Sequence, residues 1–440
     1  MVWTSKPVKK LNGSIRAPGD KSCSHRALIL GGLAEGRSHF SGLLMGDDVI
    51  RTGRAMEALG AVMREIGPGR WQVDGVGASG LRSPADALDF GNSGTGSRLM
   101  MGVMAGFDIT AELKGDESLS SRPMNRILNP LREMGLSDTA KEDGRLPFSV
   151  TGTRALRAIK YAPPVASAQV KSAVMLAGLN ADGTTIVQEA KDTRDHTERM
   201  LRGFGVDVGV NRKPNAPTEI SVKGGQGLCA IEASIPGDPS SAAFLIAAGI
   251  LSPHGDVTVE GVMSNPTRSG FFDVANLMGA HLGAEDGGDA AGERLINLHA
   301  GFAELKGVKI PERYVPSMID EFIILGVLAA FADGETHVTG AEELRVKESD
   351  RIAATAAMLR VNGVEVEETE DGFIVQGCAG AVPGGGLVET HHDHRIAMSA
   401  LVMGTASQKP VSVDSVAMID TSYPEFLDHM AQLGADISEG

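Results

Sequence analysis

The chain has 440 residues, of which 42% are hydrophobic, enough to build more than one packed core. Its formal net charge of −15 argues against broad binding to nucleic acids or anionic membranes, so any anion site must be local. Cys23, Cys229 and Cys378 show neither a disulfide rhythm nor metal-ligand spacing, which favours a reduced, cytoplasmic protein. The longest apolar runs, at residues 242–251 and 322–332, are too short to cross a bilayer and indicate buried helices.

One unit of roughly 75 residues recurs along the chain. Each copy has an amphipathic stretch that ends in a glycine, where the backbone turns left-handed, followed by a short alternating strand. These glycines are Gly60, Gly135, Gly205, Gly279, Gly363 and Gly434, spaced 75, 70, 74, 84 and 71 residues apart. A second series of Ala/Leu-rich stretches ends at or near Gly36, Gly106, Gly183, Gly255, Gly334 and Gly404. Six copies with two helices each divide most simply into three plus three.

Positive side chains stand at or near the expected helix starts. They are Lys21, Arg26, Arg122, Lys347, Arg351 and Arg395. A cation there opposes the helix dipole at a cost of roughly 0.3–1 kcal/mol, so the repeated placement predicts bound anions that compensate it. The alternative for each residue is a solvated surface position or a structural salt bridge, for example with Asp20, Glu348 or Asp350.

Three further sequence patterns are weaker evidence about function. Residues 75–80 match the letters of a dinucleotide-binding loop, but Pro84 follows and no long apolar helix begins there, so we interpret them as a loop. The sequence has no phosphate loop of the Gly-x-x-x-x-Gly-Lys type, which disfavours that kind of kinase. His391, His392 and His394 with Asp393 lack the spacing of a helical ligand pair, so structural roles are favoured over a metal site.

Taken together, six motifs resemble the 5-enolpyruvylshikimate-3-phosphate synthase family. In chain order they are Asp20-Lys21-Ser22-Cys23-Ser24-His25-Arg26, Gly91-Asn92-Ser93-Gly94-Thr95, Arg122-Pro123-Met124, Ser167-Ala168-Gln169, Arg345-Val346-Lys347-Glu348-Ser349-Asp350-Arg351 and Asp393-His394-Arg395. They are in register with the repeats and cover essentially the whole chain. The Ser-Ala-Gln triplet and residues 194–197 resemble the second sequence class of the family.

The resemblance implies an α/β (α+β) protein of two similar domains. Each would contain three βαβαββ repeats with buried helices, the inside-out α/β barrel of the enolpyruvyl transferase fold. Two crossovers near Gly19 and Gly237 would give one domain of residues 20–236 and another of residues 1–19 and 237–440. The domains would close on the substrates.

The resemblance also implies a reaction. The enolpyruvyl group of phosphoenolpyruvate would pass to the 5-hydroxyl of shikimate 3-phosphate by addition and elimination, on the route to aromatic amino acids, with no metal or organic cofactor. The contacts implied for shikimate 3-phosphate are Lys21, Ser22, Arg26, Ser167, Ala168, Gln169, Lys347 and Arg194. Those implied for phosphoenolpyruvate are Lys21, Gly94, Arg122, Gln169, Arg351 and Arg395, with Asn92 and Thr95 close by. The protein is expected to be a monomer.

Addition to a vinyl phosphate needs a base for the hydroxyl and an acid for the methylene carbon. We assign Asp320 as the base, Glu348 as the proton donor to carbon, and Lys21 as an acid at the bridging phosphate oxygen. Asp320 has a structural alternative as the N-cap of the helix at residues 322–332. Thr421 stands where many family members have a lysine, which leaves a phosphate contact there open.

Two rival functions remain at this point. The first is UDP-N-acetylglucosamine enolpyruvyl transferase, which shares the fold and the donor but carries a reactive cysteine in a loop that here, at residues 117–126, has none. The second is a non-catalytic sensor of phosphorylated metabolites, which would not need an acid–base set. The resemblance also makes the chain a candidate target of glyphosate, a mimic of phosphoenolpyruvate, since Gly94 leaves room for the inhibitor.

Overall fold

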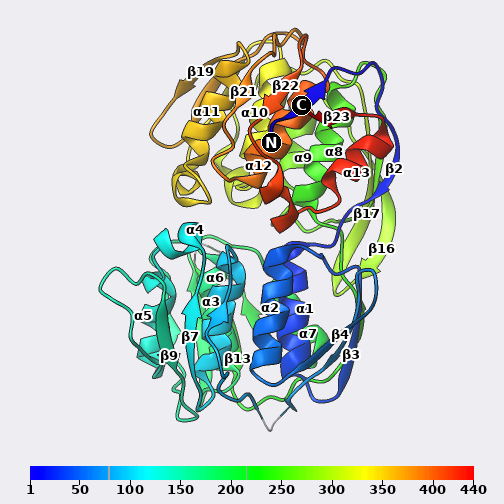
Figure 1. The fold of residues 1–440 in the computed structure, drawn as a ribbon. Coiled ribbons are helices and arrows are strands. Elements are labelled where there is room, and N and C mark those ends of the chain that lie inside the picture. Colours follow the sequence, from blue (N-terminus) through cyan, green and yellow to red (C-terminus); the bar gives the residue numbers. More distant parts are fainter. Residues whose placement is uncertain (78–79, 215) are drawn as a thin grey trace. The chain divides into compact units, whose positions relative to one another are not determined.

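The computed structural model describes residues 1–77, 80–214 and 216–440, so Ala78 and Ser79 of the glycine-rich stretch lie outside the described residues. The chain forms two compact units (Figure 1). The N-terminal unit comprises residues 19–235 and 290–292, and the C-terminal unit comprises residues 1–18, 236–289 and 293–440. Among the helices of the described residues, none is long and apolar enough to cross a membrane.

The N-terminal unit has three buried helices, each accompanied by an outer helix and a sheet. The buried helices are α1 (Lys21–Leu33), α3 (Gly94–Ala105) and α6 (Ala168–Gly178), and the others are α2 (Asp47–Ala58), α4 (Glu117–Ser121), α5 (Asn125–Met134) and α7 (His196–Gly203). The strands are β3 (Arg37–Ser41), β4 (Val62–Gly67), β5 (Arg70–Asp74), β6 (Leu88–Asp89), β7 (Thr110–Lys114), β8 (Ser137–Asp138), β9 (Phe148–Thr151), β10 (Lys160–Tyr161), β11 (Thr184–Glu189), β12 (Val208–Asn211), β13 (Thr218–Lys223) and β14 (Glu232–Ser234).

The C-terminal unit repeats this arrangement. Its buried helices are α8 (Pro239–Leu251), α10 (Phe322–Phe331) and α12 (His394–Gly404), and its outer helices are α9 (Gly270–Leu277), α11 (Arg351–Val361) and α13 (Phe426–Leu433). Short 3-10 turns are η2 (Glu312–Ser317), η3 (Glu342–Val346) and η4 (Ala417–Thr421). The strands are β1 (Trp3–Lys6), β2 (Asn12–Arg16), β15 (Asp256–Met263), β16 (Gly283–Ala290), β17 (Glu293–Gly301), β18 (Glu335–Val338), β19 (Glu365–Glu368), β20 (Phe373–Gln376), β21 (Leu387–Val388), β22 (Val411–Val413) and β23 (Asp436–Glu439).

The described residues form six sheets, and all but one share a plan. Five have four strands, in the orders β14-β3-β5-β4, β6-β7-β9-β8, β10-β11-β13-β12, β2-β15-β17-β16 and β21-β22-β1-β23, and each of these begins with a parallel pair and continues antiparallel. The sixth, β18-β20-β19, is antiparallel. The predicted repeat is confirmed, and α/β repeats with buried helices are what the structure has.

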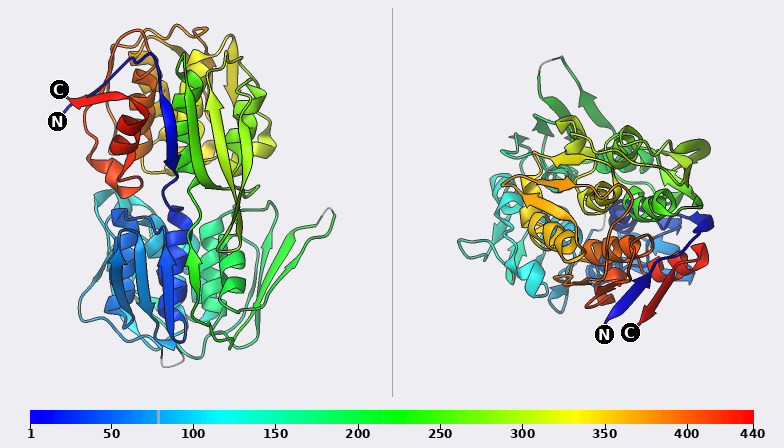
Figure 2. Two further views of the ribbon diagram at one scale, coloured as in Figure 1. Left: turned by 90° about the vertical axis from the view of Figure 1, so that its right-hand side faces the viewer. Right: turned by 90° about the horizontal axis from the view of Figure 1, so that it is seen from above.

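Two strands, β2 and β14, belong to the unit that does not contain the buried helix following them in the chain. In most copies the strand before a buried helix pairs in parallel with the strand after it, as β6 does with β7 around α3. However, β2 precedes α1 but pairs with β15 of the C-terminal unit, and β14 precedes α8 but pairs with β3 of the N-terminal unit. The first strand, β1, lies between β22 and β23, so both chain ends lie side by side in one sheet (Figure 2).

The apolar pattern explains which helices are buried. Every residue of α8 and α10 is buried, because these helices are apolar on all sides. By contrast, α5 buries only one face, which includes Ile127, Leu131 and Met134.

The two glycine series behave differently. All six glycines of the first series have a positive φ, between 81° and 124°, which confirms the predicted left-handed turns. The second series is mixed, because Gly106 has a φ of −90° and Gly404 is still part of α12. The buried helices end in several ways, since α1 and α10 are closed by an extended alanine, Ala34 and Ala332.

Candidate active site

Capping side chains hold the starts of the three buried helices in the N-terminal unit. The carboxylate of Asp20 accepts a hydrogen bond from Cys23 N at 2.7 Å, and the hydroxyls of Ser93 and Ser167 accept from the third residue of their helices. The first two positions of α1, α3 and α6 are therefore occupied by predicted contacts: Lys21, Ser22, Gly94, Thr95, Ala168 and Gln169. The helix dipoles add positive potential at these positions.

Gln169 joins two of these helix starts. Its amide nitrogen donates to Thr95 Oγ1 at 3.1 Å, and its amide oxygen accepts from Arg98 Nη1 at 2.6 Å. Arg98 lies on α3 and is only 6% exposed. Arg98 is not among the site residues predicted from the sequence motifs, although it stands four residues after Gly94, the spacing that brings side chains to the same face of a helix.

Gly94 lies between two guanidinium groups. A Cβ atom added to it would stand 3.2 Å from Arg98 Nη1 and 3.3 Å from Arg122 Nη1. Arg122 Nη2 donates to Asn92 Oδ1 at 2.6 Å and to Ser118 Oγ at 2.9 Å. Arg122, Asn92 and Gly94 are thus brought together as expected from the motifs, with Arg98 as a further cation beside them.

The remaining cations of this unit differ in exposure. Lys21 Nζ lies 2.5 Å from Asp48 Oδ2, and its side chain is 22% exposed. Arg26 is 4% exposed, and its guanidinium donates to Thr197 Oγ1 at 2.7 Å, Ser172 Oγ at 2.8 Å and the Ser22 carbonyl at 2.9 Å. Arg26 therefore fastens α1 to α6 and α7. Arg194 lies in the partly exposed segment between β11 and α7.

In the C-terminal unit, three carboxylates surround Arg351. Its guanidinium contacts Asp393 Oδ2 at 2.8 Å, Glu348 Oε2 at 2.7 Å and Asp320 Oδ1 at 3.1 Å. Arg351 is 1% exposed and Asp393 is fully buried, whereas Asp320 and Glu348 keep 16% and 27% of their side chains exposed. The structural salt bridge with Glu348, which the sequence left open, is therefore present.

Asp320 also faces Lys347, whose Nζ lies 3.6 Å from Asp320 Oδ1 and 3.0 Å from Glu343 Oε1. The N-cap of α10 is Glu321, so the structural alternative for Asp320 as that cap is wrong. Arg395 donates to the backbone carbonyl of Asp320 at 2.9 Å and lies 3.4 Å from Glu321 Oε1. Asp320, Lys347, Glu348, Arg351 and Arg395 thus form one cluster, which mixes cations with partly exposed carboxylates.

The charges of this cluster stabilise one another. Burial alone would lower the pKa of Arg351, but Asp393, Glu348 and Asp320 raise it above its usual value. Burial would likewise raise the pKa of Asp393, but Arg351 and His394 lower it. Asp393 therefore remains a carboxylate that caps α12 through Arg395 N, at 2.9 Å, and orients Arg351.

His25 is the buried histidine of the first motif. Burial, followed by the positive charges of Lys21 and Arg26, holds the pKa of His25 well below its usual value. Its Nδ1 lies 2.8 Å from Thr52 Oγ1 on α2. The imidazole is therefore neutral in the folded protein at neutral pH.

This gives a prediction for the pH dependence of stability. Only the unfolded chain binds a proton at His25 near pH 6.5, so lowering the pH through that value favours unfolding. From about pH 7.5 to about pH 5.5, His25 is expected to cost about 1.4 kcal/mol of unfolding free energy. Urea unfolding of the Trp3→Phe protein, in which fluorescence reports Trp71 alone, measures it, and adding His25→Asn is expected to reduce the loss of stability over this range. Equal losses in the two proteins would contradict the assignment.

Two other groups were candidates for metal ligands or phosphate contacts. Among the described residues, His391, His392, Asp393 and His394 are not grouped with their ligand atoms close together. Thr421 donates its hydroxyl to the Met418 carbonyl at 2.7 Å within η4.

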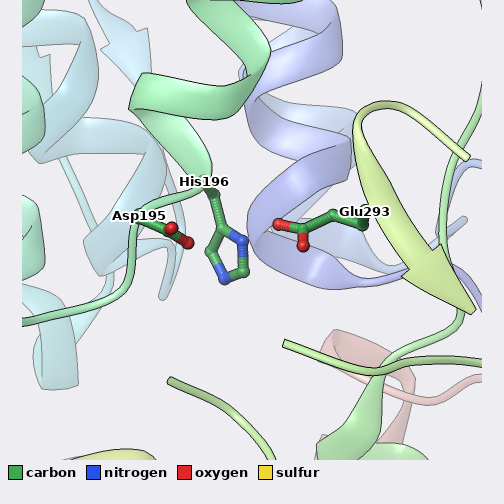
Figure 3. A group of neighbouring side chains, drawn as sticks. All are labelled: Asp195, His196 and Glu293. Atoms are coloured by element: carbon green, nitrogen blue, oxygen red, sulfur yellow. The ribbon is translucent and has the colours of Figure 1, made fainter. Parts of the chain in front are cut away.

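Figure 3 shows three further side chains, those of Asp195, His196 and Glu293. Asp195, just before α7, accepts from Arg199 Nε at 2.9 Å, and His196 begins that helix. Glu293 belongs to the C-terminal unit and accepts from Asn265 Nδ2 at 3.1 Å. These contacts account for both carboxylates within the folded units, so we assign no metal to them.

The comparisons with known proteins agree on one family. Residues 5–430 match the sequence family described as EPSP synthase (3-phosphoshikimate 1-carboxyvinyltransferase). The chain is 75% identical over 437 residues to the 3-phosphoshikimate 1-carboxyvinyltransferase of Hyphomonas neptunium, covering 99% of this chain and 100% of the relative. It is 54% identical to the Maricaulis maris protein of that name, over 98% of this chain and 96% of the relative. The solved structure of EPSP synthase from Acinetobacter baumannii superposes with a TM-score of 0.88 at 42% identity and covers 100% of both chains.

Proposed function

We propose that two groups of cations, around Arg122 in the N-terminal unit and around Arg351 in the C-terminal unit, take part in one reaction. It is the reaction of the EPSP synthase (3-phosphoshikimate 1-carboxyvinyltransferase) family, to which the chain belongs. The enzyme transfers the enolpyruvyl group of phosphoenolpyruvate to the 5-hydroxyl of shikimate 3-phosphate and releases phosphate, a step towards aromatic amino acids. The observation that carries the residue assignments is the Asp320–Arg351–Glu348 arrangement, in which an arginine contacts two partly exposed carboxylates. The proposal includes a cytoplasmic monomer with domains of residues 20–236 and of residues 1–19 and 237–440.

The N-terminal unit supplies groups suited to holding anions. Arg122 and Arg98 flank Gly94, whose missing side chain lets a ligand approach the backbone. Two guanidinium groups can share the phosphate or carboxylate of phosphoenolpyruvate, because each presents a planar fork of donors. We assign Ser167, Ala168, Gln169 and Arg194 to shikimate 3-phosphate, with Ser22 nearby, and place Arg26 as the support of that surface.

The C-terminal unit supplies the two carboxylates of the proton transfers, and Lys21 of the N-terminal unit supplies the third group. Asp320 is the base that removes the proton of the 5-hydroxyl, and its contacts with Lys347 and Arg351 orient it. In its protonated form, Glu348 donates its proton to the methylene carbon of phosphoenolpyruvate, and the resulting carboxylate takes a proton back in the elimination. Lys21 protonates the bridging oxygen as phosphate leaves, while Arg351 and Arg395 hold the donor's negative charge.

A choice of acceptor tests this function. Purified protein is incubated with phosphoenolpyruvate and either shikimate 3-phosphate or UDP-N-acetylglucosamine, and phosphate release is followed. Release with shikimate 3-phosphate alone is expected. Release only with the sugar nucleotide would move the chain to the rival transferase, and no release with either would favour a sensor of phosphorylated metabolites.

Gly94→Ala provides a prediction about inhibition by glyphosate. The added methyl group would press on the ends of the Arg98 and Arg122 side chains, which can shift, so the protein is expected to fold. Glyphosate is longer than phosphoenolpyruvate, so the methyl group is expected to weaken it more than the substrate, by about 10-fold in the ratio of inhibition constant to KM. Steady-state kinetics measures both constants, and equal losses in the two would refute the prediction.

A further inference from the structure

A buried cluster of charges lies in the N-terminal unit beside the groups assigned to shikimate 3-phosphate. Lys171 Nζ lies 2.9 Å from Glu189 Oε2 and 2.8 Å from Glu198 Oε1, and the three side chains are 1%, 4% and 3% exposed. Charges this deep are costly unless every one is paired. Nothing in the proposed reaction uses these three residues, so their role needs another explanation.

Arg26 adds the second positive charge, which matches the two negative charges of Glu189 and Glu198. Its guanidinium donates to Ser172 Oγ and Thr197 Oγ1, the neighbours in sequence of Lys171 and Glu198, and these two hydroxyls lie 2.7 Å apart. Two positive and two negative charges are thereby held between α1, α6, α7 and the end of β11. The cluster fixes how these four elements meet.

The cluster also forms hydrogen bonds with the segment between β11 and α7. Lys171 Nζ donates to the Thr193 carbonyl at 3.4 Å, and the Thr193 hydroxyl donates to Glu189 Oε1 in a short hydrogen bond. Thr193 is therefore held from its backbone and from its side chain by two members of the cluster. Arg194 is the next residue, so its backbone is set by the same contacts.

We propose that Lys171, Glu189 and Thr193 are positioning residues that hold Arg194 in place for the phosphate of shikimate 3-phosphate. This inference rests on the proposed function, in which Arg194 binds that phosphate. An apolar core of the same volume could pack α6 against α7, but it could not hold the Thr193 carbonyl and hydroxyl. In this proposal, the buried charges fix the position of the neighbouring residue Arg194.

Thr193 offers the mildest test, because it is partly exposed and its replacement leaves the Lys171 ion pairs intact. Thr193→Val keeps the shape and removes the hydroxyl, whereas Thr193→Ser keeps the hydroxyl. Thr193→Val is expected to raise the KM for shikimate 3-phosphate by about 5- to 10-fold, more than the KM for phosphoenolpyruvate, and Thr193→Ser is expected to restore it.

The matched control is Thr153→Val. Thr153 is also a partly exposed loop threonine of this unit, and its hydroxyl accepts from Ala155 N at 3.1 Å, after β9. It is expected to leave both KM values within about 2-fold of the wild type. A purely structural role for Thr193 would make the two valine variants alike.

A double-mutant cycle separates positioning from general loosening. If Thr193 acts through Arg194, Thr193→Val is expected to add almost nothing to Arg194→Ala in the KM for shikimate 3-phosphate. Full additivity, or equal rises in both KM values, would overturn the inference while leaving the proposed function intact. Absence of wild-type turnover would instead overturn the proposed function, and this inference with it.

Discussion

Arg351→Met is expected to destabilise the C-terminal unit by about 3–5 kcal/mol and to abolish turnover, because a buried ion cluster loses its cation. The variant would leave Asp393 fully buried without its guanidinium partner, next to Asp320 and Glu348. Three carboxylates would then repel one another where a single arginine held them. The loss exceeds that of a surface ion pair by several-fold.

The two tryptophans allow this loss to be localised. Trp3 lies on β1 of the C-terminal unit and Trp71 on β5 of the N-terminal unit, so urea unfolding of the Trp71→Phe protein reports on the C-terminal unit alone. Arg294→Met is the control, because its ion pair with Asp286 is 3.6 Å long and both side chains are 67% exposed. The control is expected to change stability by less than about 0.5 kcal/mol. An Arg351 variant as stable as the control would contradict the described cluster.

Asp320→Asn is expected to lower kcat by about 10²- to 10⁴-fold, because it removes the proposed base while keeping its shape. The amide can still accept a hydrogen bond from Arg351 Nη1, so the KM for phosphoenolpyruvate is expected to change far less than kcat. Stopped assays of phosphate release across a range of both substrates give the two constants.

Glu343→Gln is the matched control for this change. Glu343 also pairs with Lys347, at 3.0 Å, but it is 45% exposed and is given no part in the proton transfers. Its kcat is expected to remain within about 3-fold of the wild type. If Asp320→Asn keeps a kcat similar to that of Glu343→Gln, Asp320 is not the base.

Much of the fold could be predicted because the repeat is encoded locally. Helix-ending glycines need only short-range geometry, so all six in the first series have the expected positive φ. The apolar run at residues 322–332 became α10, Phe322–Phe331, because a segment without a polar face can only be buried. The exchange of β2 and β14 between units was beyond such reasoning, since the partner of a strand in a parallel pair depends on tertiary structure.

The sequence motifs named the residues of the candidate site but not the contacts between them. The motifs gave Gly94, Arg122 and Gln169, and the structure brings them together around Arg98, whose position inside α3 carried no helix-start signal. Helix-start cations suggested bound anions, yet Arg351 is already surrounded by protein carboxylates. Carboxylates that are distant in sequence, such as Asp393 for Arg351, leave no local pattern. The roles of the site residues remain predictions.

Phosphorus and proton NMR of one reaction mixture test the central claim most directly. With phosphoenolpyruvate, shikimate 3-phosphate and a catalytic amount of this protein, we expect the phosphoenolpyruvate phosphorus signal to give way to inorganic phosphate. Vinyl protons of an enolpyruvyl ether on shikimate 3-phosphate should appear in equal amount. Release of phosphate with pyruvate in place of that ether, or persistence of both substrates, would contradict the assignment of this chain as an enolpyruvyl transferase.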